Sequence, residues 1–599
     1  MKQPLGFVLA GLLGISVGSL SGGVTVASAS EHSEESAETL KVVYPPNAHE
    51  TTSDQIFLIG TAPTDGEVRV NGEVIERSAA GHFAPSFPLE VGENVFVLEF
   101  QDQHIELSVT RVAIASPIPE GSTFVTESLY PPVDIARLPG EPICFEAIAP
   151  PNAEVSVQLA NQTISLQASN DQITLPPNSA VLTQQNAPID VALPQAATYQ
   201  GCQSFSRPGR LGVSTYRLSH DGQSHTQSAA GTIDILDPTT PQIAEVTASS
   251  GAARTGPSTN YSRLTPLPPG TQATVTGRES NWYRLDYGVW IRDTDVTIRP
   301  GAVPTRSLIR SIRSRQVDGW TEILFPLQVP VPVSVDQGDE TFTLTLHNTT
   351  AQTDTIFVDS DPIIRRLDWT QPTPDQVRYT FRLTSDQQWG YRLRYEGTTL
   401  VLALRHPPDV SPELNDLRGV SILLDPGHGG EELGARGPTG LPEKTVNLAV
   451  SSLLRDELEQ RGATVYMTRE EDVPLSLGDR IDLINQLEPT LALSIHYNAL
   501  PDNGDAINTD GIGMFWYHPQ AHNLSVFLHD YLTETLDRPS YGVFWNNLAL
   551  TRPSVAPSVL LELGFMINPT EFEWIVDEQE QQRLAGAIAD GLAEWLSRQ

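Results

Sequence analysis

The sequence predicts a multidomain protein in which all-β modules, a sandwich and a small barrel among them, precede an α/β domain with a mostly parallel sheet flanked by helices. Three observations predict this order. The chain has 599 residues, and one hydrophobic core does not grow to that size, so we expect roughly four domains. Short apolar runs alternate at period two from residue 41 to 406, which is typical of half-buried strands. From residue 420 onward, apolar strands alternate with segments of helical spacing.

The N-terminus is typical of an export signal. Lys2 supplies positive charge, residues 5–17 are apolar but short for a membrane span, and Ala27-Ser28-Ala29 has the pattern that signal peptidase cuts after. We expect a signal peptide over residues 1–29, with an uncleaved anchor as the alternative. Because no later segment has a long apolar run, we expect no transmembrane segment after cleavage and a place outside the cytoplasm, in the periplasm or cell envelope.

The net charge limits the classes of binding partner, and the cysteine content bears on disulfide formation. The net charge is −36, which excludes nucleic acid because phosphate binding needs a basic face. The acidic surface keeps the chain in solution. The two cysteines are Cys144 and Cys202. In an oxidising compartment we expect a disulfide between them, and two buried free thiols are the alternative.

The first two β modules are expected at residues 41–115 and 133–238. In the first, Thr64-Asp65-Gly66 and Asn71-Gly72 separate runs of strand length and are typical hairpin turns. This module resembles a bacterial immunoglobulin-like sandwich, with Gly60-Thr61-Ala62-Pro63 and Gly92-Glu93-Asn94-Val95 in the usual places. The second is β-rich and holds both cysteines.

Two further β modules are expected at residues 243–298 and 306–406. The first resembles a bacterial Src-homology-three-like barrel through Ala253-Arg254-Thr255-Gly256-Pro257 and Gly288-Val289-Trp290-Ile291. Modules of that family often bind cell-wall peptides, and Trp282 and Trp290 either pack in the core or face a ligand. The second resembles an AMIN-type domain, the β module that often precedes cell-wall amidases and targets them to the envelope.

Residues 419–599 form the expected α/β domain, in which ligands bind beyond the carboxyl ends of the strands. The strands are expected at 420–424, 464–468, 491–495, 513–517 and 558–563, and the helices at 445–458, 477–487, 521–536 and 578–595. The first strand is followed by Asp425-Pro426-Gly427-His428. His496 and Asn498 follow the third strand, Glu562 stands at the end of the fifth, and Glu443 opens the first helix.

Two histidines and two glutamates thus meet at one rim of the predicted sheet. Zinc takes imidazole nitrogens and carboxylate oxygens, and a catalytic site leaves its fourth position to water. His428, Glu443 and His496 make such a set, and Glu562 is the natural general base. Asp425 is placed to orient a ligand.

This part of the chain resembles the zinc-dependent N-acetylmuramoyl-L-alanine amidases. The matching pieces are Asp425-Pro426-Gly427-His428-Gly429-Gly430, Glu443-Lys444, Thr468-Arg469, Arg480, Ser494-Ile495-His496 with Asn498, and Glu562-Leu563-Gly564-Phe565 with Asn568. The resemblance implies Zn²⁺ on His428, Glu443 and His496, and Glu562 as catalytic residue. It implies hydrolysis of the amide between muramic acid and L-alanine in peptidoglycan. For Asn498 we expect a role beside the carbonyl or in the His496 loop.

Several alternatives stay open. A zinc peptidase acting within stem peptides needs the same metal chemistry, and a cell-wall binding protein with little activity would rely on the β modules. His518 and His522 form a rival metal pair, although Pro519 and the start of a helix favour a solvated pair. Trp516 and Trp545 either line a substrate groove or pack in the core. Residues 500–557 lack room for the long inhibitory helix of some relatives, and the sequence identifies no activator protein.

Overall fold

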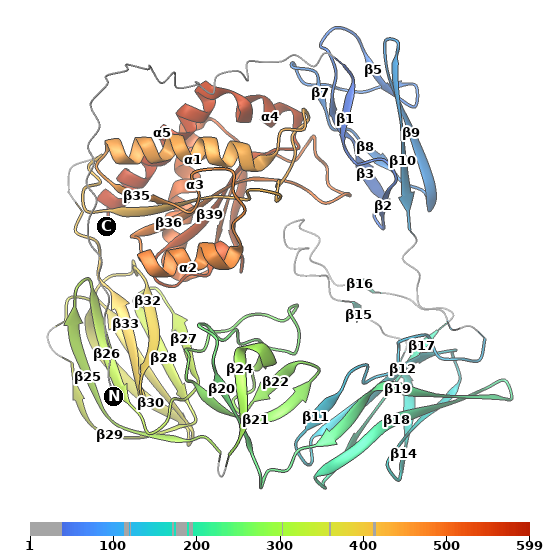
Figure 1. Ribbon diagram of the computed structural model, residues 1–599, viewed down its shortest axis with the longest axis vertical. Helices are drawn as coiled ribbons and strands as arrows, with labels where there is room; N and C mark the ends of the chain where they lie inside the picture. Colours follow the sequence, from blue (N-terminus) through green and yellow to red (C-terminus); the bar gives the residue numbers. More distant parts are fainter. Residues whose placement is uncertain are drawn as a thin grey trace, which may run out of the picture.

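The computed structural model describes residues 39–112, 119, 121–169, 173–174, 189–190, 196–301, 304–358, 361–410 and 415–599. The expected signal peptide, residues 1–29, lies outside the described residues. Four β units and one α/β domain follow one another along the chain (Figure 1). Each has its own cluster of buried apolar side chains. The described part of the chain contains no helix that is both long and apolar enough to cross a membrane.

The N-terminal β unit, residues 39–112, encloses Ile56, Phe83 and Leu98, all of which are fully buried. Its strands form sheets ordered β1-β4-β7 and β2-β10-β9-β5-β6, with a separate β3-β8 pair. Leu58 separates β3 from β4, and its N–H donates to the carbonyl of Pro85. The strands are β1 Lys41–Tyr44, β2 His49–Thr51, β3 Gln55–Phe57, β4 Ile59–Thr61, β5 Val68–Val70, β6 Glu73–Val74, β7 His82–Phe83, β8 Ser86–Pro88, β9 Gly92–Phe100 and β10 Gln103–Arg111.

The second and third β units share one continuous sheet. β11 pairs in parallel with β19 of the second unit and antiparallel with β21 of the third. The two units keep separate cores, but their ladders join, which the sequence did not indicate. Their strands are β11 Ile135–Arg137, β12 Pro142–Ala149, β13 Glu154–Leu159, β14 Gln162–Ser169, β15 Ile173–Thr174, β16 Ile189–Asp190, β17 Ala197–Ser204, β18 Gly209–His220, β19 Gln223–Ile235, β20 Gln242–Val246, β21 Gln272–Glu279, β22 Trp282–Leu285, β23 Trp290–Arg292 and β24 Val296–Pro300, with a 3-10 turn η2 at Asp293–Asp295.

The cysteines of these units form a disulfide, and the tryptophans are buried. Cys144 on β12 and Cys202 on β17 are directly opposite each other and form a disulfide. Trp282 and Trp290 are 5% and 8% exposed. The guanidinium of Arg292 lies over the ring of Trp282, and that of Arg137 lies over the ring of Trp290. Of the two roles left open for these tryptophans, the structure therefore favours the core.

The fourth β unit, residues 304–406, packs one sheet, β29-β25-β26-β33-β32, with a second, β27-β28-β31-β30. Phe325, Phe342 and Phe381 fill the space between them and are fully buried. The strands are β25 Ser307–Val317, β26 Trp320–Pro326, β27 Val333–Gln337, β28 Thr341–His347, β29 Thr349–Phe357, β30 Ile364–Thr373, β31 Gln376–Leu383, β32 Tyr391–Glu396 and β33 Thr399–Arg405.

The α/β domain has a six-stranded sheet ordered β35-β34-β36-β39-β37-β38, in which only the β37–β39 pairing is antiparallel. The strands are β34 Ser421–Pro426, β35 Thr464–Met467, β36 Leu491–Asn498, β37 Ile512–Trp516, β38 Ser540–Trp545 and β39 Ser558–Phe565. The helices are α1 Glu443–Gln460, α2 Leu477–Leu487, α3 His522–Leu536, α4 Pro569–Val576 and α5 Glu578–Ser597, with 3-10 turns η3 Pro519–Ala521 and η4 Ala549–Thr551. The mostly parallel sheet agrees with the expectation, whereas β38 and α4 were not expected.

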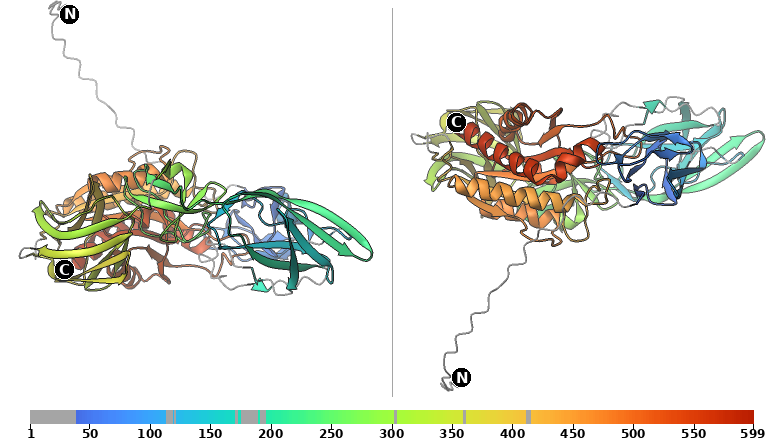
Figure 2. Two further views of the ribbon diagram at one scale, coloured as in Figure 1. Left: turned by 90° about the horizontal axis from the view of Figure 1, so that it is seen from below. Right: turned by 90° about the horizontal axis from the view of Figure 1, so that it is seen from above.

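The two faces of this sheet are covered differently. α1, α3 and α5 pack on one face, and α1 and α5 lie side by side on the outside (Figure 2). On the other face, Ile484 of α2 shares a buried cluster with Trp320 and Ala403 of the fourth β unit. Arg392 of that unit forms an ion pair with Glu488, with 2.5 Å between Nη1 and Oε1. The fourth β unit therefore completes the cover of the sheet.

Candidate metal centre

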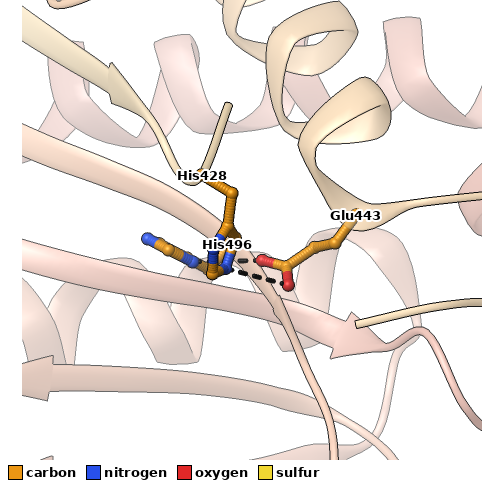
Figure 3. A group of neighbouring side chains, drawn as sticks. All are labelled: His428, Glu443 and His496. Carbon is orange, nitrogen blue, oxygen red and sulfur yellow. Dashed lines mark hydrogen bonds and ion pairs between the residues drawn. The ribbon is translucent and has the colours of Figure 1, made fainter. Parts of the chain in front are cut away.

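Three side chains from three separate segments converge at the carboxyl ends of β34 and β36. His428 lies in the turn after β34, Glu443 is the first residue of α1, and His496 lies within β36 (Figure 3). One ligand-type atom of each lies within 4.8 Å of those of the others. Nε2 of His428 is 3.1 Å from Oε2 of Glu443, and Nδ1 of His496 is 3.0 Å from Oε1 of Glu443.

Glu443 is held in place by several donors. Its Oε2 accepts the N–H of Ala435 at 2.9 Å, and its Oε1 accepts the N–H of Tyr497 at 3.1 Å and Nδ2 of Asn447 at 3.0 Å. A carboxylate in the first turn is also favoured by the helix dipole. Burial alone would raise the pKa of Glu443, but hydrogen bonds with His428 and His496 bring it well below its usual range. Glu443 is therefore a rigid, ionised ligand candidate.

Two glycines give the imidazoles the space they occupy. A Cβ at Gly427 would lie 2.2 Å from Cε1 of His496, and a Cβ at Gly434 would lie 2.3 Å from Oε2 of Glu443. No side chain fits at either position without displacing the cluster. His428 itself adopts a left-handed φ of 61°, a conformation uncommon for residues other than glycine. Burial lowers the pKa of His428, but the neighbouring Glu443 carboxylate outweighs this effect and raises it above the usual value.

Glu562 lies beside the cluster on the adjacent strand. In the parallel pairing of β36 with β39, His496 is the direct partner of Glu562, so their side chains project from the same face of the sheet. Oε2 of Glu562 is buried and has no hydrogen-bond partner among the described residues. Burial, reinforced by the negative charge of Glu443, raises the pKa of Glu562 well above its usual value. Such a carboxylate is suited to accept a proton.

Asp425 supports the site indirectly, through Arg480. It is 1% exposed and accepts from Nη1 of Arg480 at 2.5 Å, Oγ1 of Thr468 and Oγ of Ser494. Arg480 in turn donates from Nη2 to the carbonyl of His428 at 2.7 Å. Asp425 thus fixes the turn that carries His428.

Asn498 lies at the end of β36. Its Oδ1 accepts the N–H of Ala499 at 2.8 Å, and its carbonyl accepts the N–H of Met566. It therefore ties the strand end of His496 to the segment after Glu562.

Other supporting residues were not assigned a role from the sequence. Arg469 donates to the carbonyls of Pro426, Gly427 and Lys444. Asn447 bridges Glu443 and the carbonyl of Gly427. The position of Asn447, four residues after Glu443 on one helix face, is the only sequence signal that points to it.

The rival features lie away from this cluster. Nε2 of His518 is 2.7 Å from the carbonyl oxygen of Arg552, and burial lowers the pKa of His518 to about 4. The expectation of a solvated pair is wrong for His518 because the fourth β unit covers it, with the ring of Tyr391 packed edge-on. Trp516 and Trp545 are paired on β37 and β38 beyond Phe515, whereas Gly513 is the β37 residue opposite Glu562. These tryptophans lie toward the opposite end of the sheet.

Residues 422–594 match the family model of N-acetylmuramoyl-L-alanine amidases. This segment is an amidase domain. Residues 249–293 match the bacterial SH3 domain, within the barrel expected at 243–298.

Relatives that this domain matches include proteins named as probable cell-wall amidases. The chain is 34% identical over 196 residues to the "Probable cell wall amidase LytH" of Staphylococcus epidermidis. This alignment covers 32% of this chain and 64% of the relative. The chain is 36% identical over 195 residues to the protein of the same name from Staphylococcus aureus, covering 32% and 62%. The match therefore spans less than two thirds of these relatives. The solved catalytic domain of CwlV, an N-acetylmuramoyl-L-alanine amidase from Bacillus (Paenibacillus) polymyxa var. colistinus, is 30% identical, with a TM-score of 0.28, covering 30% of this chain and 98% of that one.

Proposed function

We propose that this chain is an exported, zinc-dependent amidase that hydrolyses the bond between N-acetylmuramic acid and the L-alanine of the peptidoglycan stem peptide. The observation that carries the proposal is the convergence of His428, Glu443 and His496 beside the unpartnered carboxylate oxygen of Glu562 in a domain of the amidase family. This hydrolysis would take part in cell-wall remodelling or in the separation of daughter cells.

The residues present fit a zinc ion. Two imidazoles and one carboxylate are a usual ligand set for catalytic zinc. Gly427 and Gly434 leave space that any Cβ would fill. The ion would be held by His428, Glu443 and His496, and when bound it supplies Lewis acidity toward the carbonyl and lowers the pKa of water.

Glu562 performs the proton transfers in this proposal. Its free Oε2 takes a proton from the attacking water and later gives it to the nitrogen of L-alanine as the amide bond breaks. Because burial and the charge of Glu443 raise its pKa, Glu562 holds a proton more firmly than an exposed carboxylate does, which suits it to accept and carry the proton. Asp425 and Arg480 keep the His428 turn fixed during this exchange, and Asn498 holds the end of the strand that carries His496.

The β units complete the proposal. The SH3-type third unit supplies affinity for wall peptides, and the fourth unit acts as an AMIN-like targeting domain for the envelope. We place the protein in the periplasm or cell envelope, with peptidoglycan as its substrate. The net charge of −36 makes nucleic acid an unsuitable partner.

Product analysis tests the proposal. Purified peptidoglycan is incubated with the full chain, with and without chelator, and soluble products are identified by mass spectrometry. We expect intact stem peptides with a free N-terminal alanine, and their loss on chelation. Cleavage within the stem peptide would instead indicate a zinc peptidase. Wall binding without any products would indicate that the β units provide the main function.

A further inference from the structure

We propose that the N-terminal β unit, residues 39–112, is a positioning part of the active site and not a free wall-binding arm. It docks on the segments that flank Glu443, His496 and Glu562 and thereby holds the rim of the site. Figure 1 shows this unit beside α4 of the amidase domain. The inference rests on the proposed amidase function, because the residues it positions are those assigned to that reaction.

The strongest polar contact is made to the loop that follows β36. Asp502, six residues after His496, accepts a hydrogen bond from the hydroxyl of Tyr44 at Oδ1. Its Oδ2 lies 3.0 Å from Nε2 of His49. Gln55 donates from Nε2 to the carbonyl of Asn503 in the same loop. The Asp502 carboxylate is thus held by Tyr44 at the end of β1 and by His49 at the start of β2. Both residues precede Asp502 by more than 400 positions.

An apolar cluster extends this contact toward Glu562. Phe57, Ile59 and Ala84 of the N-terminal β unit pack with Ala506, Phe565 and Ile567 of the amidase domain, and all six are nearly inaccessible to solvent. Phe565 lies only three residues after Glu562 on β39.

Tyr541 links this cluster to the carboxylate. Its ring packs edge-on against Phe565, with 5.0 Å between the ring centroids. Its pKa is raised by burial and by the charge of Glu562. The packing contributed by the N-terminal β unit therefore reaches side chains that lie beside the proposed base.

The N-terminal β unit also contacts the segment before Glu443 and the helix after Glu562. Nζ of Lys41 donates to the carbonyl of Thr439 at 2.6 Å, four residues before Glu443. The N–H of Ala80 donates to Oε1 of Glu573 at 2.8 Å, and the ring of His82 packs edge-on against Phe572 of α4. One β unit thus touches the chain next to three of the four proposed site residues.

Loop 499–511 depends on this support because it contains no helix or strand. Catalytic groups lose activity when small displacements misalign them, and loops that carry function need a rigid scaffold to hold them. A module that only delivered the enzyme to the wall would have no need to bury Phe57 and Ile59 against the amidase domain. The geometry therefore fits positioning better than delivery.

The test uses the full chain with Asp502→Ala, which removes the acceptor for Tyr44 and His49, and the milder Tyr44→Phe. Asp590→Ala is the matched control, because Asp590 forms a 2.6 Å ion pair with Arg461 between α5 and the end of α1, away from the N-terminal β unit. Tyr395→Phe matches the tyrosine change, because its hydroxyl donates to the carbonyl of Val331 within the fourth β unit. Amide hydrogen exchange, zinc affinity, kcat and KM on a soluble muramyl-peptide are measured for each.

We expect Asp502→Ala to speed amide exchange in residues 499–511 and to lower kcat about tenfold, with KM nearly unchanged. Tyr44→Phe should have the same effects but weaker. Both control variants should behave as wild type. Faster exchange with an unchanged kcat, or a raised KM alone, would overturn the positioning role. A wild-type chain that binds zinc but cleaves nothing would refute the proposed function instead. In that case the inference is judged on zinc affinity, and an unchanged Kd in Asp502→Ala overturns it.

Discussion

His496 and Glu562 are direct partners across the parallel pairing of β36 with β39. Neighbouring strands of a sheet are only about 4.8 Å apart, so the pairing alone brings an imidazole and a carboxylate to the same place without any loop between them. The rigidity of a central sheet then fixes the distance between a proposed metal ligand and the proposed base. The register of the sheet, more than the conformation of a loop, therefore sets the positions of His496 and Glu562.

The first prediction concerns the base. Glu562→Gln keeps the shape of the side chain but cannot take a proton, so we expect the rate of stem-peptide release to fall by about a hundredfold to ten-thousandfold. Bound zinc should remain, because Glu562 is not one of the three proposed ligands. Release rates are measured by mass spectrometry, and Glu578→Gln at the exposed start of α5 is the control. Activity near the wild-type rate would exclude Glu562 as the base.

A second prediction concerns the metal ligands. His428→Ala, His496→Ala and Glu443→Gln should each reduce zinc below the expected content of about one ion per chain and abolish hydrolysis. Elemental analysis after dialysis gives the stoichiometry. His522→Ala is a suitable control because that ring packs against Trp516 and lies outside the cluster. Full zinc content in all three variants would show that the ion binds elsewhere.

The buried pair of Asp425 and Arg480 leads to a third prediction. Both side chains are at most 3% exposed, and Asp425→Asn leaves the guanidinium charge without its partner. We expect a loss of about 3 to 5 kcal/mol of unfolding free energy for the amidase domain, measured by chemical denaturation. Glu67→Gln removes the exposed partner of Arg69 and should cost less than about 1 kcal/mol. Equal effects of the two substitutions would contradict the structural account of Asp425.

Glu571 gives a prediction about pH. Burial raises its pKa from 4.5 to about 7, although its oxygens accept the N–H groups of Phe565 and Gly511. Because the folded-state pKa is the higher one, the native state binds more protons between these values. The stabilisation is complete below pH 4.5 and is lost as the pH rises through 7.

The size of this effect follows from the shift and amounts to about 3 kcal/mol at most. Glu571→Gln cannot titrate, so the difference in unfolding free energy between wild type and variant should shift in favour of the variant across this pH range. Denaturant titrations at several pH values measure it. A constant difference from pH 4 to 8 would contradict the raised pKa.

The fifth prediction separates stability from catalysis. The Cys144–Cys202 disulfide closes a loop with a sequence separation of 58, for which chain entropy gives about 4 kcal/mol of stabilisation. Cys144→Ser with Cys202→Ser should therefore lower the unfolding free energy of the second β unit, as measured by hydrogen exchange. Zinc content and hydrolysis should stay as in wild type. A loss of activity would link this unit to the reaction.

The sequence predicted the α/β domain well because its elements have strong local signals. The segment 477–487 was expected as a helix and is α2, whose Ser476 cap accepts the N–H of Asp479. β38 was missed because Gly542 and the preceding Pro539 read as turn residues. α4 was missed because it has only eight residues, too few for a clear helical period.

The site was predicted less completely than the fold. His428, Glu443, His496 and Glu562 were named because strand ends in such sheets collect ligands. His496 was expected just after a strand but lies within β36, and Glu562 lies within β39. Asp425 was named without its partner Arg480, since pairing between residues 55 positions apart leaves no local pattern. Nothing in the sequence indicated that Phe57 and Phe565 share one buried cluster. Strands at an interdomain surface and strands in a domain core have the same alternation of apolar and polar residues.

The docking of the N-terminal β unit also has a consequence for how the chain is made. Residues 41–86 are synthesised before the segments that they contact, and their binding surface is complete only after residue 573 has been added. Phe57 and Ile59 therefore remain uncovered until Phe565 and Ile567 have been synthesised, and uncovered apolar side chains on an incomplete chain promote aggregation. Assembly of this protein thus needs contacts between residues roughly 400 to 500 positions apart, so refolding should be slow even where each unit folds rapidly. Competing aggregation should lower the refolding yield as the protein concentration rises.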